Sequence, residues 1–240
     1  MPIIRWLPFC VLAALAAQAG ADDAPRYFES GAGTDVAAFV TENCVACHTV
    51  KPSGNGPRSS ASSPVQSGPP LYYAGDKYRQ EWLRDWLQAP ERIRPAGHYP
   101  PAHIQTTPDG DVIDEASLVT HPALDAELAE EVAGFLMTLT PYAERLAEED
   151  YEPGSVSLRM GQMDFRRFKG CVACHEDVQG EGGKSGPELH SAWRRLQPEF
   201  IVSFVRSPVQ WNQDTMMPAL EMNDAAIHKL VDYLKTIAEE

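Results

Sequence analysis

The sequence contains little positive charge, few cysteines and no long hydrophobic run beyond its N-terminal segment. Of its 240 residues, 20 are Lys or Arg and 34 are Asp or Glu, which gives a formal net charge of −14. Affinity for nucleic acid comes mainly from Lys and Arg that neutralise phosphates, so this balance argues against a nucleic-acid-binding protein. After Ala21 no stretch approaches about 18 consecutive apolar residues, so no membrane span is expected.

The N-terminal segment has the three parts of a cleavable signal peptide. Arg5 supplies a positive charge, Trp6 to Ala17 form an apolar stretch, and residues 19–21 read Ala-Gly-Ala, a small-x-small cleavage site. We therefore expect residues 1–21 to be removed on export.

Four of the five cysteines lie in two identical motifs, and the fifth, Cys10, lies in the expected signal peptide. Residues 44–48 and residues 171–175 both read Cys-Val-Ala-Cys-His. This C-x-x-C-H pattern is the attachment signature of c-type haem. A zinc site would need further Cys or His at ligand spacing, and the chain has no other cysteine. The two copies therefore predict two covalently bound haem c groups, each containing iron.

Each residue of the motif has a chemical task. Two thiols form thioether bonds to the two vinyl groups of one porphyrin, and the following His lies under the iron as its proximal ligand. The predicted cofactor-binding residues are Cys44, Cys47, Cys171 and Cys174, and the predicted proximal metal ligands are His48 and His175.

On these motifs the chain resembles a dihaem class I cytochrome c, with tandem domains in a cytochrome c4-like layout. The resemblance implies an all-α fold in which each domain wraps around one covalent haem, and it implies electron transport in the bacterial periplasm. We expect domain 1 at residues 22–142 with loop insertions, an acidic, exposed linker at 143–152, and domain 2 at 153–240. The resemblance also implies that the carbonyls of Pro69 and Pro187 accept the N–H of the proximal imidazoles.

Both halves run through the same order of features, which supports two similar domains. The first half has two additions, a Gly/Pro/Ser-rich segment at 51–70 and a polar insertion at 104–121 with a turn signal at 108–110. No strong strand pattern is present. The expected helical stretches are residues 35–42, 81–88 and 128–139 in the first half, and 161–169, 199–206 and 223–237 in the second.

A class I domain usually has a methionine followed by proline as the distal iron ligand. In the second half Met217 precedes Pro218 and lies nine residues after Pro208, a spacing that suits this family. We expect Met217 to be the distal ligand of the second haem, with Met216 as the neighbouring alternative.

The first half departs from this pattern. Nine residues after Pro90, the counterpart of Pro208, the chain has Tyr99 where a methionine is expected. The adjoining His98 is our candidate for the distal metal ligand of the first haem. The alternatives are His103 and a distal side that is open or occupied by Tyr99. We expect His121, in the polar insertion, to be a surface residue.

With these ligands the first haem would be bis-His and the second His/Met. Methionine raises the potential, so the first haem would have the lower potential. The expected function is transfer of single electrons between redox protein partners, and a basic docking face on a partner would complement the acidic chain. The alternative is a haem enzyme with an open distal site on the first haem, with peroxidase-like chemistry or redox chemistry on small sulfur or nitrogen oxides.

Overall fold

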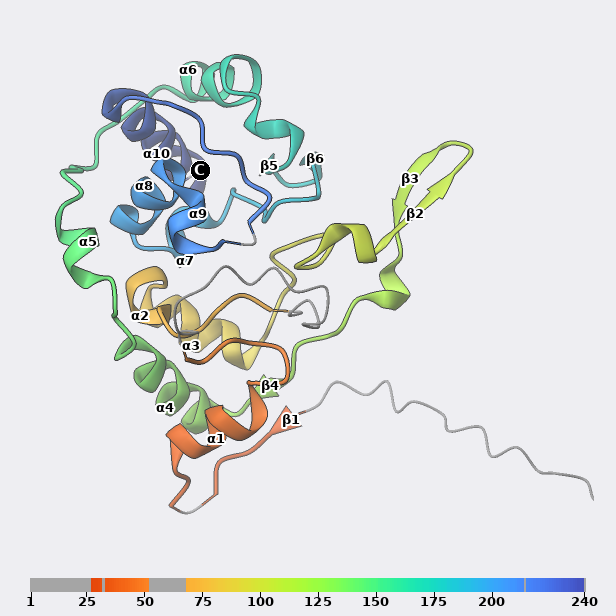
Figure 1. The fold of residues 1–240 in the computed structure, drawn as a ribbon, viewed down its shortest axis with the longest axis vertical. Helices are drawn as coiled ribbons and strands as arrows, with labels where there is room; N and C mark the ends of the chain where they lie inside the picture. Colours follow the sequence, from red (N-terminus) through yellow and green to blue (C-terminus); the bar gives the residue numbers. More distant parts are fainter. Residues whose placement is uncertain (1–26, 32, 52–67, 214, 240) are drawn as a thin grey trace, which may run out of the picture.

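The computed structural model describes residues 27–31, 33–51, 68–213 and 215–239. The expected signal peptide and most of the Gly/Pro/Ser-rich segment lie outside these described residues. Two groups of helices, one from each half of the chain, lie side by side and are connected along one edge by α5, Ala143–Ala147 (Figure 1). No helix in the described part of the chain has the length and apolar character needed to cross a bilayer.

The first half contains four helices, two short 3-10 turns and four short strands. These are β1 (Tyr27–Phe28), α1 (Val36–Asn43), α2 (Ala74–Lys77), α3 (Gln80–Gln88), η1 (Pro100–Ala102), β2 (Ile104–Thr107), β3 (Gly110–Ile113), η2 (Glu115–Ser117), β4 (Ala123–Leu124) and α4 (Ala126–Met137), all within the described residues.

The second half has its helices in a similar order, but it lacks a counterpart of the 104–121 insertion. Its described elements are α6 (Leu158–Met163), the π-helical turn η3 (Asp164–Phe168), η4 (Cys171–Ala173), β5 (Glu176–Val178), β6 (Glu181–Gly182), α7 (Ala192–Arg195), α8 (Pro198–Arg206), α9 (Pro208–Trp211) and α10 (Asp224–Glu239).

Side-chain caps begin the helices that the sequence pattern predicts. The carboxylate of Asp35 accepts the amides of the first turn of α1, and the carboxylate of Asp125 does the same for α4. Asn223 accepts the Ala226 amide at 3.0 Å at the start of α10. These bonds satisfy amides that have no partner within the helix, so the helices begin where polar caps precede apolar periodicity.

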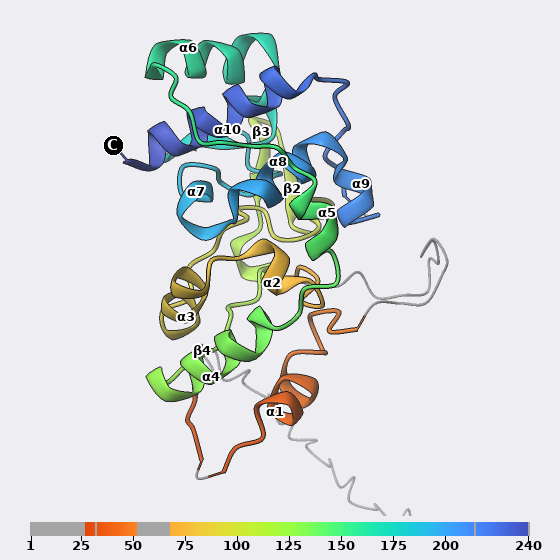
Figure 2. The same cartoon turned by 90° about the vertical axis from the view of Figure 1, so that its left-hand side faces the viewer.

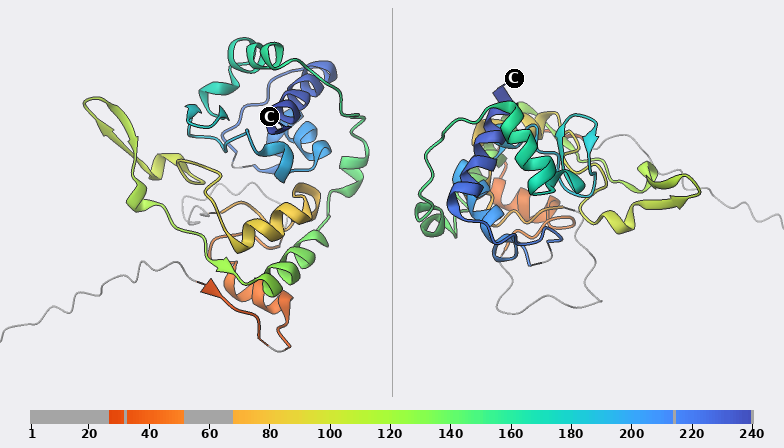
Figure 3. Two further views of the ribbon diagram at one scale, coloured as in Figure 1. Left: turned by 180° about the vertical axis from the view of Figure 1, so that it is seen from behind. Right: turned by 90° about the horizontal axis from the view of Figure 1, so that it is seen from above.

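The expectation of an all-α fold is corrected by three small two-stranded sheets. β1 pairs with β4 in parallel, whereas the pairs β2–β3 and β5–β6 are antiparallel. The β2–β3 hairpin turns at Gly110, whose φ of +118° is a conformation that favours glycine. This hairpin projects from the helical body (Figures 1 and 3). The strands are too short to give an alternating pattern, which is why the sequence did not indicate them.

The acidic linker is less exposed than its composition suggested. It contains α5, whose Leu146 is only 8% exposed, and α5 packs on α8. The Glu149 carboxylate pairs with the Arg206 guanidinium at 2.9 Å. Part of the linker therefore covers the second half, because one apolar residue and one ion pair hold it there.

The two halves meet through equivalent segments. Tyr78 and Leu196, which are 118 residues apart, form an antiparallel bridge between the end of α2 and the end of α7. One backbone bond flanks the bridge on each side, Arg79 N to Arg195 O and Gln197 N to Lys77 O, both 3.0 Å. The flanking residues are also related by the 118-residue offset, so the contact has a pseudo-two-fold axis of the kind found in symmetric dimers.

An aromatic cluster fills the interface beside this bridge (Figure 2 shows the two halves edge-on). The ring centre of Trp211 lies 4.8 Å from that of Phe200, 5.2 Å from Tyr142 and 5.5 Å from Tyr73. Trp211 and Tyr73 are almost fully buried. Aromatic rings contribute large apolar area, so this cluster joins the cores of the two halves into one.

Candidate functional site

The first C-x-x-C-H motif continues from the C-terminal end of α1. The chain turns tightly there, with the His48 amide bonded to the Cys44 carbonyl at 2.9 Å. The Nδ1 of His48 donates to the carbonyl of Pro69 at 2.7 Å, which leaves Nε2 with its lone pair. Gly68 lies directly over this ring: a Cβ there would be 2.6 Å from Nδ1. The Gly-Pro pair therefore fits closely around the imidazole and fixes its orientation.

The second motif has the same construction. The His175 amide bonds to the Cys171 carbonyl at 3.1 Å, and Nδ1 of His175 donates to the Pro187 carbonyl at 2.8 Å. A Cβ on Gly186 would lie 2.5 Å from that Nδ1. The hydrogen bonds expected at Pro69 and Pro187 are thus both present. Each holds one imidazole in the tautomer that can bind a metal through Nε2.

The motif cysteines are free thiols, which excludes a disulfide among the described cysteines. Burial raises the pKa of Cys44 and of Cys171 to about 11. No cluster of three or more Cys, His, Asp or Glu side chains forms within the described ranges. Zinc usually takes four protein ligands, whereas each proximal His offers one nitrogen. Paired thiols with one axial nitrogen fit a porphyrin, which supplies the equatorial nitrogens itself.

Three basic side chains gather at the interface between the halves. Arg195 is only 3% exposed and pairs with the Glu188 carboxylate at 3.3 Å. Lys77 and Arg94 are partly buried, and among the described residues neither has a carboxylate partner. Burial lowers the pKa of both side chains. A buried cation without a counter-charge is costly, so these side chains fit a group that brings negative charge.

These cations lie near both proximal histidines. Burial is the main cause that lowers the pKa of His48 and of His175. Lys77 lowers the pKa of His48 further, and Arg94 and Arg195 do so for His175. The propionate carboxylates of a haem are anionic groups of the required kind, so the residues at both motifs fit haem.

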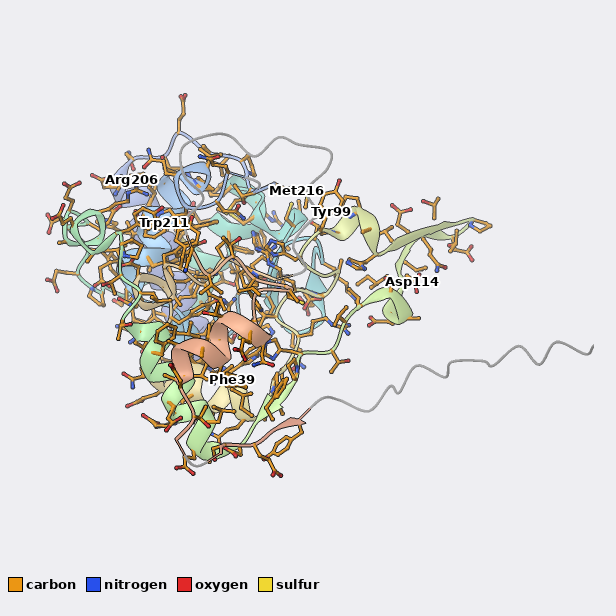
Figure 4. The ribbon with its side chains drawn as sticks, turned by 60° about the horizontal axis from the view of Figure 1, so that its bottom comes forward. Phe39, Tyr99, Asp114, Arg206, Trp211 and Met216 are labelled. Carbon is orange, nitrogen blue, oxygen red and sulfur yellow. The ribbon has the colours of Figure 1, made fainter. Side chains whose placement is uncertain are left out.

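The residues near the expected distal position of the first half lie in different surroundings. Tyr99 is 43% exposed and lies five residues before the insertion, whereas Asp114 lies within it, directly after the β2–β3 hairpin (Figure 4). Burial, Arg94 and Lys77 lower the pKa of His98 to about 4, and its buried Nδ1 has no hydrogen-bond partner. His98 therefore lies near the basic cluster. His48 also lowers the pKa of His98, but less than Arg94 and Lys77 do.

His103 lies at the base of the projecting hairpin. Its Nδ1 is 2.8 Å from the Oγ of Ser117, and its ring packs against Gly97. Ser117 lies within the insertion, and Gly97 lies seven residues before it. They fix the side chain at the hairpin base.

The expectation that His121 is a surface residue is wrong. Its side chain is partly buried, and its ring centre lies 6.1 Å from that of His48 and 4.7 Å from that of Trp86. Its Nδ1 donates to the Pro122 carbonyl at 2.8 Å. The count from Pro90 missed this residue because the insertion separates it from the position where a ligand was expected.

In the second half Met217 is half-buried, whereas Met216 is 54% exposed. Figure 4 labels Met216. The Met217 amide donates to Oγ1 of Thr215 at 3.2 Å, which holds the backbone before Pro218. The difference in burial favours Met217 as the residue that faces the interior.

Two family comparisons cover most of the described chain. Residues 34–140 match the cytochrome c family, and residues 157–234 match the family described as cytochrome c oxidase, cbb3-type, subunit III. Neither a curated protein nor a solved structure matches the chain. Together the two matches support a class I cytochrome c that carries covalently bound haem c, takes part in electron transfer and has redox partners.

Proposed function

We propose that the chain is a periplasmic dihaem c-type cytochrome that passes single electrons between redox protein partners. The observation that carries this proposal is the repeated proximal geometry, in which each motif histidine is held by a Gly-Pro carbonyl. Domain 1 would comprise residues 22–142 and domain 2 residues 153–240, with the linker at 143–152. Residues 1–21 would direct export and be removed.

In this proposal Cys44 and Cys47 bind haem 1, and Cys171 and Cys174 bind haem 2. His48 and His175 are the proximal ligands, and Met217 is the distal ligand of haem 2. A bound haem supplies reversible one-electron exchange at its iron. The protein holds the imidazoles in one tautomer, excludes water and sets the charge around each site.

The basic cluster of Lys77, Arg94 and Arg195 supports a shared arrangement of the two haems. These side chains lie at the pseudo-two-fold contact and act on both proximal histidines. Placed there, they would neutralise propionates from both sites. One set of cations shared by both sites would hold the two haems near the interface, which suits direct transfer of an electron between the domains.

The two sites would differ in potential. A thioether at haem 2 favours Fe(II) and raises its potential, whereas a second imidazole at haem 1 lowers it relative to the methionine-ligated site. Electrons would run downhill from haem 1 to haem 2. The net charge of −14 favours a partner with a basic docking face, because opposite fields speed encounter.

The test is the haem content of the purified holoprotein and of two matched variants. The pyridine haemochrome assay should give two haems per chain for the wild type. It should give one haem for Cys44→Ala/Cys47→Ala and one for Cys171→Ala/Cys174→Ala. Mass spectrometry should place the mature N-terminus at Asp22. One haem in the wild type would contradict the proposal, and rapid peroxide turnover at a high-spin haem would favour the enzyme alternative.

A further inference from the structure

Beyond the proposed function, on which this inference rests, we propose that His121 is the distal ligand of haem 1. Neither His98 nor His103 would then bind that iron. The proposal stands on the position of His121 opposite His48, on the hydrogen bond that fixes its tautomer, and on its place before the last helix of the domain.

The distance between the two rings fits one metal ion between them. A bond from an imidazole nitrogen to a transition metal is about 2 Å, so two imidazoles on opposite sides of one iron have ring centres about 6 Å apart. The His48 and His121 ring centres are 6.1 Å apart, and the ring planes are 65° to each other. His98 shows no comparable ring contact with His48 among the described residues.

Both rings are also prepared for binding in the same way. Nδ1 of His48 donates to a prolyl carbonyl, and Nδ1 of His121 donates to the carbonyl of Pro122. Each ring therefore keeps its Nε2 lone pair for a metal. The indole of Trp86 packs on the His121 ring and limits its rotation. By contrast, the buried Nδ1 of His98 has no partner in the protein, and Arg94 and Lys77 both act on this side chain, so it can donate to a propionate held by these cations.

The sequence around His121 repeats the distal segment of the second domain. Residues 121–124 read His-Pro-Ala-Leu, and residues 217–220 read Met-Pro-Ala-Leu. Both segments lie shortly before the closing helix: His121 is five residues before the first residue of α4, and Met217 is seven residues before the first residue of α10. When the two halves are aligned on the shared Pro-Ala-Leu, His121 therefore occupies the place of Met217.

The insertion explains why counting from the other end gives a different residue. His121 lies 31 residues after Pro90, whereas Met217 lies nine residues after Pro208. The extra 22 residues contain the β2–β3 hairpin, which projects from the body and returns the chain to the site. β4 then pairs with β1 directly after Pro122, and this pairing fixes the backbone next to His121.

The experiment compares the spin state of the oxidised holoprotein with that of His121→Ala, His98→Ala and His103→Ala. We expect the wild type to have two low-spin haems by absorption and electron paramagnetic resonance. His121→Ala should turn one haem high-spin, and added imidazole should restore the low-spin signal. The two control variants should stay low-spin. His121→Met should raise the potential of haem 1 and add a second sulfur-to-iron band to that of Met217.

The outcomes separate this inference from the proposed function. A low-spin spectrum in His121→Ala, or a high-spin haem in His98→Ala or His103→Ala that imidazole converts, would overturn the assignment while leaving two haems in place. A wild type with one high-spin haem would overturn it as well. A haem count of one per chain would instead refute the dihaem proposal. If His121→Ala does not fold, the His121→Met spectrum decides: an unchanged potential and no new band would refute the assignment.

Discussion

The helix crossing at Gly161 offers a quantitative test of the packing in domain 2. Gly161 of α6 lies against the ring of Tyr233 in α10, and a Cβ at residue 161 would be 2.7 Å from Cγ of that ring. The ring cannot move aside freely, since Tyr233 is fully buried and its hydroxyl donates to Asp177 at 2.6 Å. Substitution Gly161→Ala therefore forces either the helices or the hydrogen bond apart.

The expected net effect of Gly161→Ala is destabilisation by about 1–5 kcal/mol. Alanine has a helix propensity about 1 kcal/mol better than glycine. Overpacking a buried contact costs about 1–3 kcal/mol. Weakening the Tyr233 hydrogen bond to a buried carboxylate adds a cost of about 1–3 kcal/mol. The two costs outweigh the gain in helix propensity.

The assay is guanidinium unfolding of the holoprotein, with Gly134→Ala as the matched control. Gly134 lies in α4, and a Cβ there would meet nothing within 4 Å. This control should therefore stabilise the protein by about 1 kcal/mol through helix propensity alone. Opposite shifts of the two midpoints are expected. A higher midpoint for Gly161→Ala as well would show that the close approach to Tyr233 does not constrain the crossing.

Three further predictions concern the His175 site, the basic cluster and the cap of α4. Gly186→Ala should push the His175 ring from its place and turn haem 2 partly high-spin, which absorption of the oxidised protein will show. Lys77→Met should lower the potential of haem 1 in a redox titration, because a nearby cation disfavours the oxidised iron. The amide of Leu128 holds the pKa of Asp125 below its usual value, so its stabilising effect is present above about pH 4 and is lost as the pH falls further. Asp125→Asn should then lower the urea midpoint at neutral pH and have a smaller effect in acid.

The sequence was most informative where a short motif carries the chemistry. The motif histidines were recognised because each follows its two cysteines directly, at a spacing fixed by the geometry of one porphyrin. The Gly-Pro pairs that hold them were expected from the family resemblance, since they lie at different distances along the chain from the two histidines. The capped helices α1, α4 and α10 were expected for the same reason, since the caps and the apolar period are local features.

The sequence was least informative where the site depends on segments that are far apart. Counting forward from Pro90 assumed a constant loop length and gave Tyr99, next to the candidate His98, whereas in our proposal the projecting hairpin moves the equivalent position to His121. The basic cluster was not recognised as a unit, because Lys77 and Arg195 meet only through the pseudo-two-fold contact. Such pairings come from tertiary structure and leave no periodic pattern in the chain.

The backbone bonds across the pseudo-two-fold contact have a kinetic consequence. Salt screens charges, but it has little effect on hydrogen bonds between buried peptide groups. The relative position of the two domains should therefore be the same at low and high ionic strength. Electron exchange between the haems would then be first order and independent of salt, while delivery by a basic partner would slow as salt rises. A change in ionic strength alone could therefore change which step limits the overall rate. Delivery by the partner would become limiting as salt rises.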